Sequence, residues 1–198
     1  MSRDLPLALA FDTSAAHCAV ALLAGDRVLA ERVEPMTKGQ AERLFPLLDE
    51  ILAEAGLGWA DLDVIGVGTG PGNFTGIRIA VAAARGLALS LRIPAIGISV
   101  TEAAALDLPR PCRVVIPSRK DQVIWQDFGL EGEGRPQQAA ADTLPPGPAP
   151  AAPLMPLAVA MARIALARRH TPAPRPAPIY LRPADAAPSR DAPVVMLP

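Results

Sequence analysis

The hydrophobic residues of this chain fall into short uninterrupted runs separated by turn residues. The first three runs are Leu7–Phe11, Cys18–Leu23 and Val28–Val33. Gly25-Asp26 marks the turn between the second run and the third. Short apolar runs bounded by Gly, Asp and Ser are typical of β-strands. Because the connections are short, the three runs predict an antiparallel meander.

A helix is predicted over Gln40–Ala55, because apolar residues recur there every three or four positions. Thr37 and Gln40 have the spacing of a capping box, in which the Thr37 hydroxyl is the N-cap. Gly56 favours a stop after the helix, and Pro46 should kink it. The predicted apolar face holds Leu44, Leu47, Leu48, Ile51, Leu52 and Ala55.

Strands and helices then alternate up to about residue 106. The order of elements in this first part reads β-β-β-α-β-α-β, which predicts an α/β fold: a mixed sheet with helices packed against it. The elements that complete this order are a strand over Leu62–Val67, a helix over Thr75–Leu91 capped by Asn73 or Thr75, a strand over Ala95–Ile98 and a short helix over Thr101–Leu106.

The second half of the chain has a different composition. Arg113–Ile116 and Val123–Phe128 predict a hairpin, and the sequence is loop-like after Gly129. Of the 23 prolines, 14 lie from Pro145 onward. One further helix is predicted over Leu157–Arg169. The organisation of the chain therefore changes after the first hundred residues, and we expect a disordered tail over residues 186–198.

The loop before the long helix is rich in glycine. Gly66, Gly68, Gly70 and Gly72 alternate there, with Pro71 between the last two. A Gly-rich turn at a helix N-terminus can hold a phosphate. However, the spacing fits neither the Rossmann fingerprint nor a Walker A loop. A tight strand-to-helix turn is the simpler interpretation, and nucleotide binding is the alternative.

The predicted helix Thr75–Leu91 is apolar almost all round. Its only charges, Arg78 and Arg85, are seven residues apart and share one narrow stripe. Such a helix must be covered on every side. A sheet can cover one side, and a second layer of the fold or a partner subunit must cover the other. The arginines, and Pro94 beyond the helix, argue against a membrane span.

Composition excludes several classes of function. The chain is 51% hydrophobic and 20% charged, with a net charge of −1, which gives no general attraction to nucleic acid or anionic membranes. Cys18 and Cys112 suggest neither a disulfide framework nor a zinc site. With no targeting segment in the sequence, we expect a cytoplasmic protein.

No complete catalytic set is visible in the sequence. Asp12 ends the first strand and could hold Mg²⁺, although capping of the local turn is the simpler role. His17 and His170 are isolated, so no metal site is predicted. Arginines near the C-terminus could touch an RNA backbone, but such a stretch is more often a solvated surface.

Four segments together resemble the TsaB (YeaZ) family: LALAFDTSAAHCAVALL, GTGPGNFTGIRIAVAAARGLAL, IPAIGISV and PIYLRPADA. The resemblance covers residues 5 to about 128 and then a short stretch around Ile179–Arg182. It implies an actin/hexokinase-like (ASKHA, ribonuclease H-like) fold with two subdomains. The first covers residues 1–100, the second is a shortened, Pro/Ala-rich subdomain over 101–177, and residues 178–185 return to the first. The second subdomain is shorter than the family's, and Gln40 stands where the family usually has histidine.

The resemblance also implies a function. The family supplies a non-catalytic dimerisation subunit, without a cofactor of its own, for the complex that moves threonylcarbamoyl from its adenylate to the tRNA adenosine next to the anticodon. The implied partners are the TsaD transferase, the TsaE ATPase, tRNA through the complex, and a second copy when isolated. A nucleotide-binding module and a glycoprotease-like hydrolase are the alternatives.

The resemblance places the interface on two helices and a remnant of a nucleotide loop on one turn. The turn is Asp12-Thr13-Ser14, which lacks the glycine of a working phosphate loop. The expected interface residues are Leu44, Leu48, Ile51, Thr75, Ile77, Arg78, Val81, Ala82, Arg85 and Leu89.

Overall fold

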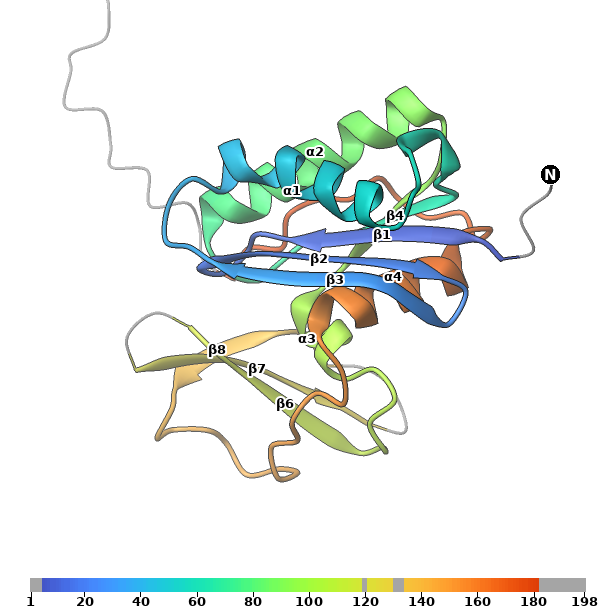
Figure 1. Ribbon diagram of the computed structural model, residues 1–198. Coiled ribbons are helices and arrows are strands. Elements are labelled where there is room, and N and C mark those ends of the chain that lie inside the picture. The colour runs from blue at the N-terminus through green and yellow to red at the C-terminus, as the bar shows by residue number, and fades with distance from the viewer. Residues whose placement is uncertain (1–4, 119–120, 130–133, 182–198) are drawn as a thin grey trace, which may run out of the picture.

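The computed structural model describes residues 5–118, 121–129 and 134–181. Its centre is a five-stranded sheet in the order β3-β2-β1-β4-β5 (Figure 1). The first three strands are antiparallel neighbours, and β1, β4 and β5 run parallel. The structure thus confirms the predicted meander and mixed sheet. The strands are β1 (Leu7–Asp12), β2 (His17–Ala24), β3 (Arg27–Pro35), β4 (Val64–Gly68) and β5 (Ala95–Ile98).

Helices cover both faces of this sheet (Figure 1). Because side chains alternate along a strand, Leu7, Leu9 and Phe11 of β1 pack in one core cluster, beneath the helices α1 and α2. Ala8 and Ala10 lie on the opposite face, in a second cluster with α4. The helices are α1 (Gln40–Glu54), α2 (Phe74–Leu91), the short α3 (Val100–Ala104) and α4 (Leu157–Arg168), and a 3₁₀ turn, η1, spans Trp59–Asp61.

The helix α4 packs on the first sheet, although the sequence-based boundaries assigned it to the second subdomain. Its small side chains meet small side chains of the strands, so the two backbones approach closely. A Cβ added at Gly66 would lie 3.0 Å from the Met161 carbonyl oxygen and 3.0 Å from the Ala10 Cβ. Eight of the twelve residues of α4 are buried as a result.

A second, three-stranded sheet lies below the first in Figure 1. Its antiparallel order is β6-β7-β8. The first two strands are the predicted hairpin, whereas β8 falls where a loop was expected. Arg113 of β6 is 3% exposed and donates to both carboxylate oxygens of Asp127 on β7. It also donates to the Pro145 carbonyl oxygen, which holds the loop after β8 against this sheet. The strands are β6 (Cys112–Pro117), β7 (Gln122–Phe128) and β8 (Gln137–Ala140).

The two long helices begin differently. The Asn73 side chain caps α2 by accepting from the Thr75 and Gly76 amides at 3.0 and 3.3 Å, as the sequence predicts. The capping box predicted for α1 is wrong, because Gly39 is the N-cap, with a φ of 88° and no side-chain cap. Gln40 instead donates to the Met36 carbonyl oxygen. A glycine tolerates this left-handed φ, so the chain can enter the helix without a Thr37 cap.

The described end of the chain returns to the first sheet. The Ile179 amide donates to the Thr69 carbonyl oxygen at 2.8 Å. Ile179 thus lies beside the end of β4, and the return of residues 178–185 to the first subdomain stays a prediction, since only 178–181 of them are described. Residues 182–185 and the tail 186–198 lie outside the described residues.

Candidate functional site

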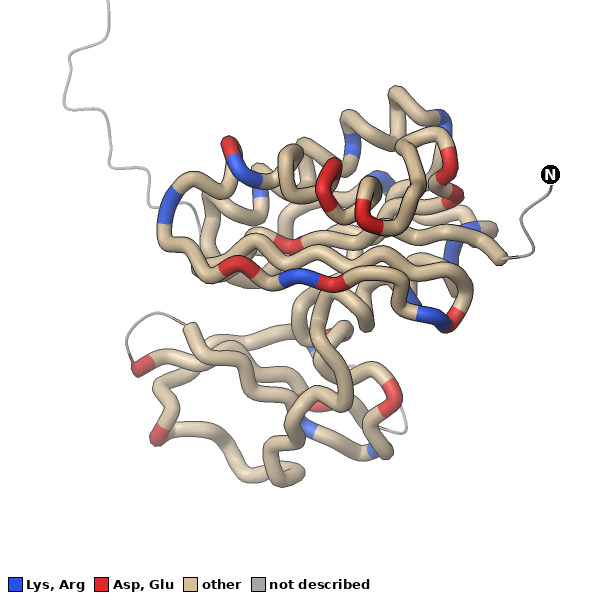
Figure 2. The backbone as a smooth tube through the Cα atoms, viewed as in Figure 1, with Lys and Arg blue, Asp and Glu red and all other residues tan. Residues whose placement is uncertain are grey.

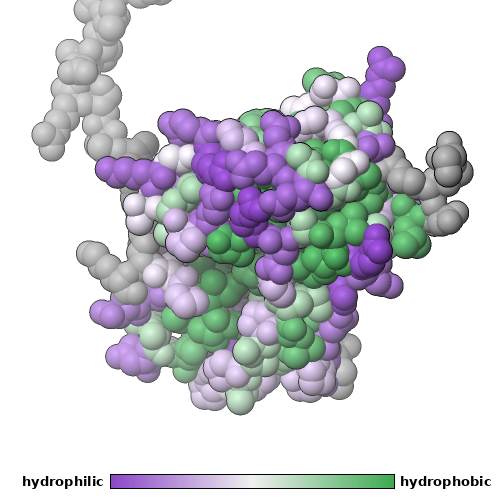
Figure 3. Space-filling view, viewed as in Figure 1, coloured by the Kyte–Doolittle hydropathy of each residue, from purple (hydrophilic) through white to green (hydrophobic). Residues whose placement is uncertain are grey.

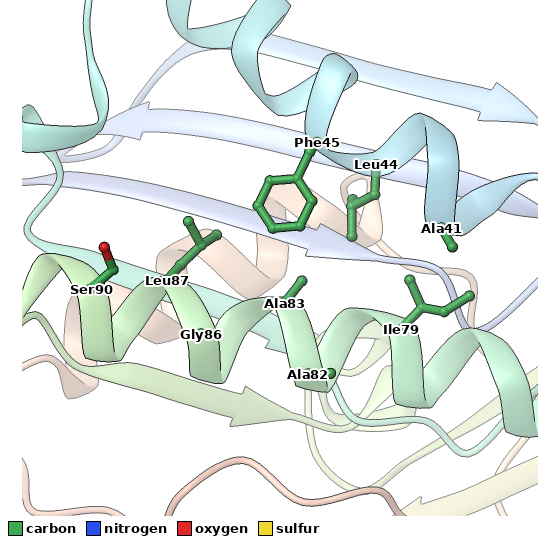
Figure 4. Close-up of a pocket in the computed structure, with 9 residues that line it drawn as sticks. All are labelled: Ala41, Leu44, Phe45, Ile79, Ala82, Ala83, Gly86, Leu87 and Ser90. Carbon is green, nitrogen blue, oxygen red and sulfur yellow. The ribbon is translucent and has the colours of Figure 1, made fainter.

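An apolar groove lies between α1 and α2 on the side of these helices that faces away from the sheet (Figure 4). It encloses about 590 Å³, and carbon atoms make up most of its lining. Phe45 stands at its edge with 44% of its surface exposed. An exposed aromatic ring beside an open apolar groove is typical of a binding surface. The groove is lined by Ala41, Leu44, Phe45, Ile79, Ala82, Ala83, Gly86, Leu87 and Ser90.

The groove is open because the outward residues of α2 are small. Ile77, Ala80 and Ala84 face the sheet and are fully buried. Ala82 and Gly86 are exposed on the other side of the helix, and a Cβ added at Gly86 would meet no atom within 4 Å. Within the described residues, the fold itself therefore covers only the side of α2 that faces the sheet, and no second layer covers the other side.

In the described part of the chain, α2 is the one helix long and apolar enough to cross a membrane by length and composition. The core helix of a soluble protein passes the same test. Here one side of α2 packs on the sheet, and Arg78 and Arg85 stand on its exposed side.

The ten expected interface residues divide into two groups in the structure. One group is buried in the free chain, although Leu44 of this group also lines the groove. The other group is exposed, and Leu89 is 83% exposed. The sequence pattern did not single out Phe45 and Gly86, which line the groove; Phe45 could have been noticed as an aromatic residue off the buried stripe of its helix. The buried group is Leu44, Leu48, Ile51, Ile77 and Val81, and the exposed group is Thr75, Arg78, Ala82, Arg85 and Leu89.

Charged residues gather on the side of α1 that faces β3 (Figure 2), and Figure 3 shows hydrophilic side chains across the same region. Arg43 donates to Glu34 at 2.6 and 2.7 Å and to Glu50 at 2.6 and 2.7 Å. These hydrogen bonds from the guanidinium hold the pKa of Glu34 and of Glu50 below their usual range. By contrast, the Arg85 guanidinium on α2 forms no hydrogen bond or ion pair with the described residues. The charges beside β3 are thus satisfied within the chain, whereas α2 presents an unpaired cation.

The turn Asp12-Thr13-Ser14 lies against the start of α2. Asp12, 1% exposed, accepts through Oδ2 from the Ser14 amide and hydroxyl, at 3.2 and 2.9 Å. Its other oxygen is buried and has no hydrogen-bond partner among the described residues. The Thr13 hydroxyl donates to the Gly76 carbonyl oxygen at 2.6 Å. The three residues are therefore brought together, as the sequence predicts; their role as a remnant of a nucleotide loop stays a prediction.

The glycines around α2 are explained by this turn rather than by a ligand. A Cβ at Gly68 would lie 2.0 Å from Asp12 Oδ1, one at Gly72 would lie 2.4 Å from the Ser14 carbonyl oxygen, and one at Gly76 would lie 1.8 Å from the Thr13 carbonyl oxygen. Only glycine allows such close approach of two chain segments. The strand-to-helix interpretation of the Gly-rich loop accounts for these three positions.

The polar residues of this turn do not form a hydrolase site. Ser14 Oγ and His17 Nε2 both contact Asp12 Oδ2, each at 2.9 Å. Activation of a serine requires the histidine to stand between the serine and the carboxylate, whereas here the carboxylate stands between the other two. Within the described residues, no group of three His, Cys, Asp or Glu side chains could hold a metal ion.

Comparisons with known proteins identify the family. Residues 27–147 match the family described as TsaD, tRNA N6-adenosine threonylcarbamoyltransferase. An uncharacterized Mycobacterium tuberculosis protein is 34% identical over 177 residues, which cover 81% of this chain and 83% of that protein. The tRNA threonylcarbamoyladenosine biosynthesis protein TsaB of Haemophilus influenzae is 40% identical over 129 residues, which cover 62% of this chain and 54% of that protein.

Solved structures agree with this family and with the fold. A Pseudomonas aeruginosa protein described as similar to peptidase YeaZ superposes with a TM-score of 0.71 at 27% identity, over 90% of this chain and 100% of that one. YeaZ from Pseudomonas aeruginosa superposes with a TM-score of 0.65 at 28% identity, over 83% of this chain and 93% of that one. These likenesses and the mixed sheet confirm the predicted actin/hexokinase-like α/β fold. The chain belongs to the TsaB (YeaZ) family.

Proposed function

We propose that this chain is the non-catalytic dimerisation subunit of the complex that forms threonylcarbamoyladenosine in tRNA. In this proposal it binds a TsaD-like transferase through α1 and α2, so that threonylcarbamoyl passes from its adenylate to the tRNA adenosine next to the anticodon. The names of the Haemophilus influenzae and Escherichia coli relatives support the pathway. A TsaE-like ATPase joins the complex, and the chain contacts tRNA only as part of that complex.

One observation carries the proposal: the α1–α2 groove is apolar and uncovered. A partner that covers this apolar surface removes it from water, which stabilises the complex by about 25 cal/mol for each Å² of apolar surface buried. The small residues of α2 allow another helix to approach closely. In the isolated chain a second copy can occupy the same surface, which gives a homodimer. The histidine and serine of the Asp12 turn, arranged as described above, favour neither hydrolysis nor metal chemistry.

The experiment is to measure binding of the purified TsaD-family subunit from the same organism to three forms of the chain. Gly86→Glu places a charged side chain at the groove, and its Cβ would meet no atom of the described chain within 4 Å. Burying that carboxylate without a partner should weaken the complex at least about tenfold. Val28→Glu adds the same charge on the exposed part of β3, outside the groove, and should bind like wild type.

The result that would overturn the proposal is the absence of a complex with the wild-type chain. If wild type and Gly86→Glu bind the TsaD-family subunit equally well, the complex exists but the groove is not part of its interface. Since Gly86→Glu lies at an open helix position, circular dichroism should show an unchanged fold, so that a loss of binding reports the groove and not unfolding.

A further inference from the structure

Tyr180 is held at the beginning of α2 by the returning end of the chain. Beside it, the Ile179 amide donates to the Thr69 carbonyl oxygen at 2.8 Å. The Tyr180 ring stacks on the Phe74 ring, with 4.8 Å between centroids and an angle of 31° between planes. Tyr180 is nevertheless 40% exposed. The contact joins parts of the chain that are far apart in sequence, and it sets an aromatic pair at the surface beside the groove.

This aromatic pair orients Arg78. The Arg78 Nε donates to the Tyr180 hydroxyl oxygen at 2.8 Å. The guanidinium carbon lies 3.8 Å from the Phe74 ring centroid and 5.8 Å from the Tyr180 ring centroid. The two terminal nitrogens form no hydrogen bond or ion pair with the described residues, so the side of the guanidinium suited to paired hydrogen bonds is free. Arg78 is thus a fixed, exposed cation with unused donors.

Arg78 stands on the same stripe of α2 as the exposed residues beside the groove. Residues at spacings of four, seven and eleven share one side of a helix, which places Ala82, Arg85 and Leu89 in line with Arg78. The position is therefore continuous with the surface assigned above to the partner.

We infer that Arg78 is the anchor for a carboxylate of the protein partner, and that Tyr180 is a positioning residue for this anchor. The inference rests on the proposed function. An arginine side chain loses conformational entropy when it is ordered. Since Tyr180 and Phe74 already order the guanidinium in the free chain, less of that cost falls on binding. A carboxylate matches the two free terminal nitrogens in geometry and charge.

The surroundings of Arg78 favour a protein over RNA. Leu89, 83% exposed, lies on the same stripe, and the groove beside it is apolar. A phosphate backbone would leave such surface uncovered, whereas a helix carrying apolar and acidic residues covers both parts. The chain as a whole has a net charge of −1, which does not attract RNA.

The test is a double-mutant cycle on the dissociation constant of the complex between the full chain and the purified TsaD-family subunit, at low and at high salt. Arg78→Ala should weaken the complex about tenfold at low salt. Tyr180→Phe keeps the stacked ring and removes only the hydroxyl acceptor; it should weaken the complex about threefold. In the Arg78→Ala background, Tyr180→Phe should have no further effect, because the hydroxyl acts through Arg78.

Two controls separate this role from a structural one. Arg27→Ala removes an equal charge from β3 and should bind like wild type, because the Arg27 guanidinium has no hydrogen bond or ion pair with the described residues. Arg78→Lys keeps the charge but cannot offer paired donors, so it should restore little of the affinity. The losses of affinity caused by Arg78→Ala and by Tyr180→Phe should both be smaller at high salt, because salt screens the ion pair. Thermal unfolding of Tyr180→Phe should match wild type.

Each outcome has one meaning. A complex that forms with wild type but is unaffected by Arg78→Ala overturns the inference and leaves the proposed function standing. An equal effect of Tyr180→Phe with and without Arg78 overturns the positioning role. Absence of any complex overturns the proposed function and the inference with it. If Arg78→Ala weakens binding of tRNA to the isolated chain but not binding of the protein subunit, the ligand of Arg78 is a phosphate and the inference is wrong.

Discussion

Two glycines of the same helix, Gly76 and Gly86, should respond in opposite directions to replacement by alanine. Both lie within α2, and helix propensity alone favours alanine at both by up to about 1 kcal/mol. Their surroundings differ: a Cβ at Gly86 would meet nothing within 4 Å, whereas one at Gly76 would lie 1.8 Å from the Thr13 carbonyl oxygen. A backbone oxygen cannot rotate aside as the end of a side chain can, so α2 or the Asp12 turn must move.

The size of the effect follows from these contacts. Gly86→Ala should raise the free energy of unfolding by up to about 1 kcal/mol. For Gly76→Ala, overpacking costs about 1–3 kcal/mol. The displaced backbone also loses the hydrogen bond from the Thr13 hydroxyl, which contributes about 1 kcal/mol. After the gain in propensity, Gly76→Ala should be about 1–3 kcal/mol less stable than wild type, and about 2–4 kcal/mol less stable than Gly86→Ala.

Urea unfolding followed by circular dichroism measures this difference. With a slope of about 2 kcal/mol per molar urea, the two midpoints should lie about 1–2 M apart, and the slope itself should not change. If Gly76→Ala is as stable as Gly86→Ala, the Asp12 turn does not seat the start of α2 as described here. The explanation of the Gly-rich loop would then fail, and a ligand role for its glycines would return.

Three further predictions concern the interface, the charged network and a thiol. Leu44→Ala should cost about 2–5 kcal/mol of stability because Leu44 is fully buried. Leu89→Ala should leave stability unchanged and weaken the complex. A large loss of stability for Leu89→Ala in urea unfolding would contradict this division. Because Arg43 lowers the pKa of Glu34 and Glu50 in the folded chain, the stability from this network is present above the unfolded pKa of about 4.5 and is lost as the pH falls through the lower folded values. The urea midpoint of wild type should therefore fall more between about pH 5 and pH 3 than that of Arg43→Ala, and parallel curves would show that the network adds nothing. Burial raises the pKa of the Cys18 thiol to about 11, so a thiol reagent at pH 8 should label Cys18 slowly in the folded chain and rapidly in urea; equal rates would mean that β2 opens readily.

Local sequence patterns predicted most of the elements correctly, because local interactions specify them. Apolar runs and turn residues located the β1–β3 meander, and Asn73 marked the start of α2. The failures have local causes as well. Gly39 enters α1 with a left-handed φ that makes the Thr37 cap unnecessary. The four residues of β8, QQAA, carry no strand pattern of their own, and only their pairing with β7 makes them a strand.

The sequence by itself determined that this chain is a mixed α/β protein of the TsaB (YeaZ) family with one long apolar helix. Only the tertiary structure decided which way that helix faces. The charged stripe of Arg78 and Arg85 is too narrow to show how much of the helix is covered. In the fold Ala80 and Ala84 pack on the sheet, and Ala82 and Gly86 stay outward. The position of α4 on the first sheet also depends on tertiary packing, because its small residues lie close to Ala10 and Gly66. The contact of Tyr180 with Arg78 joins residues 102 positions apart, and such contacts exist only once the chain has folded.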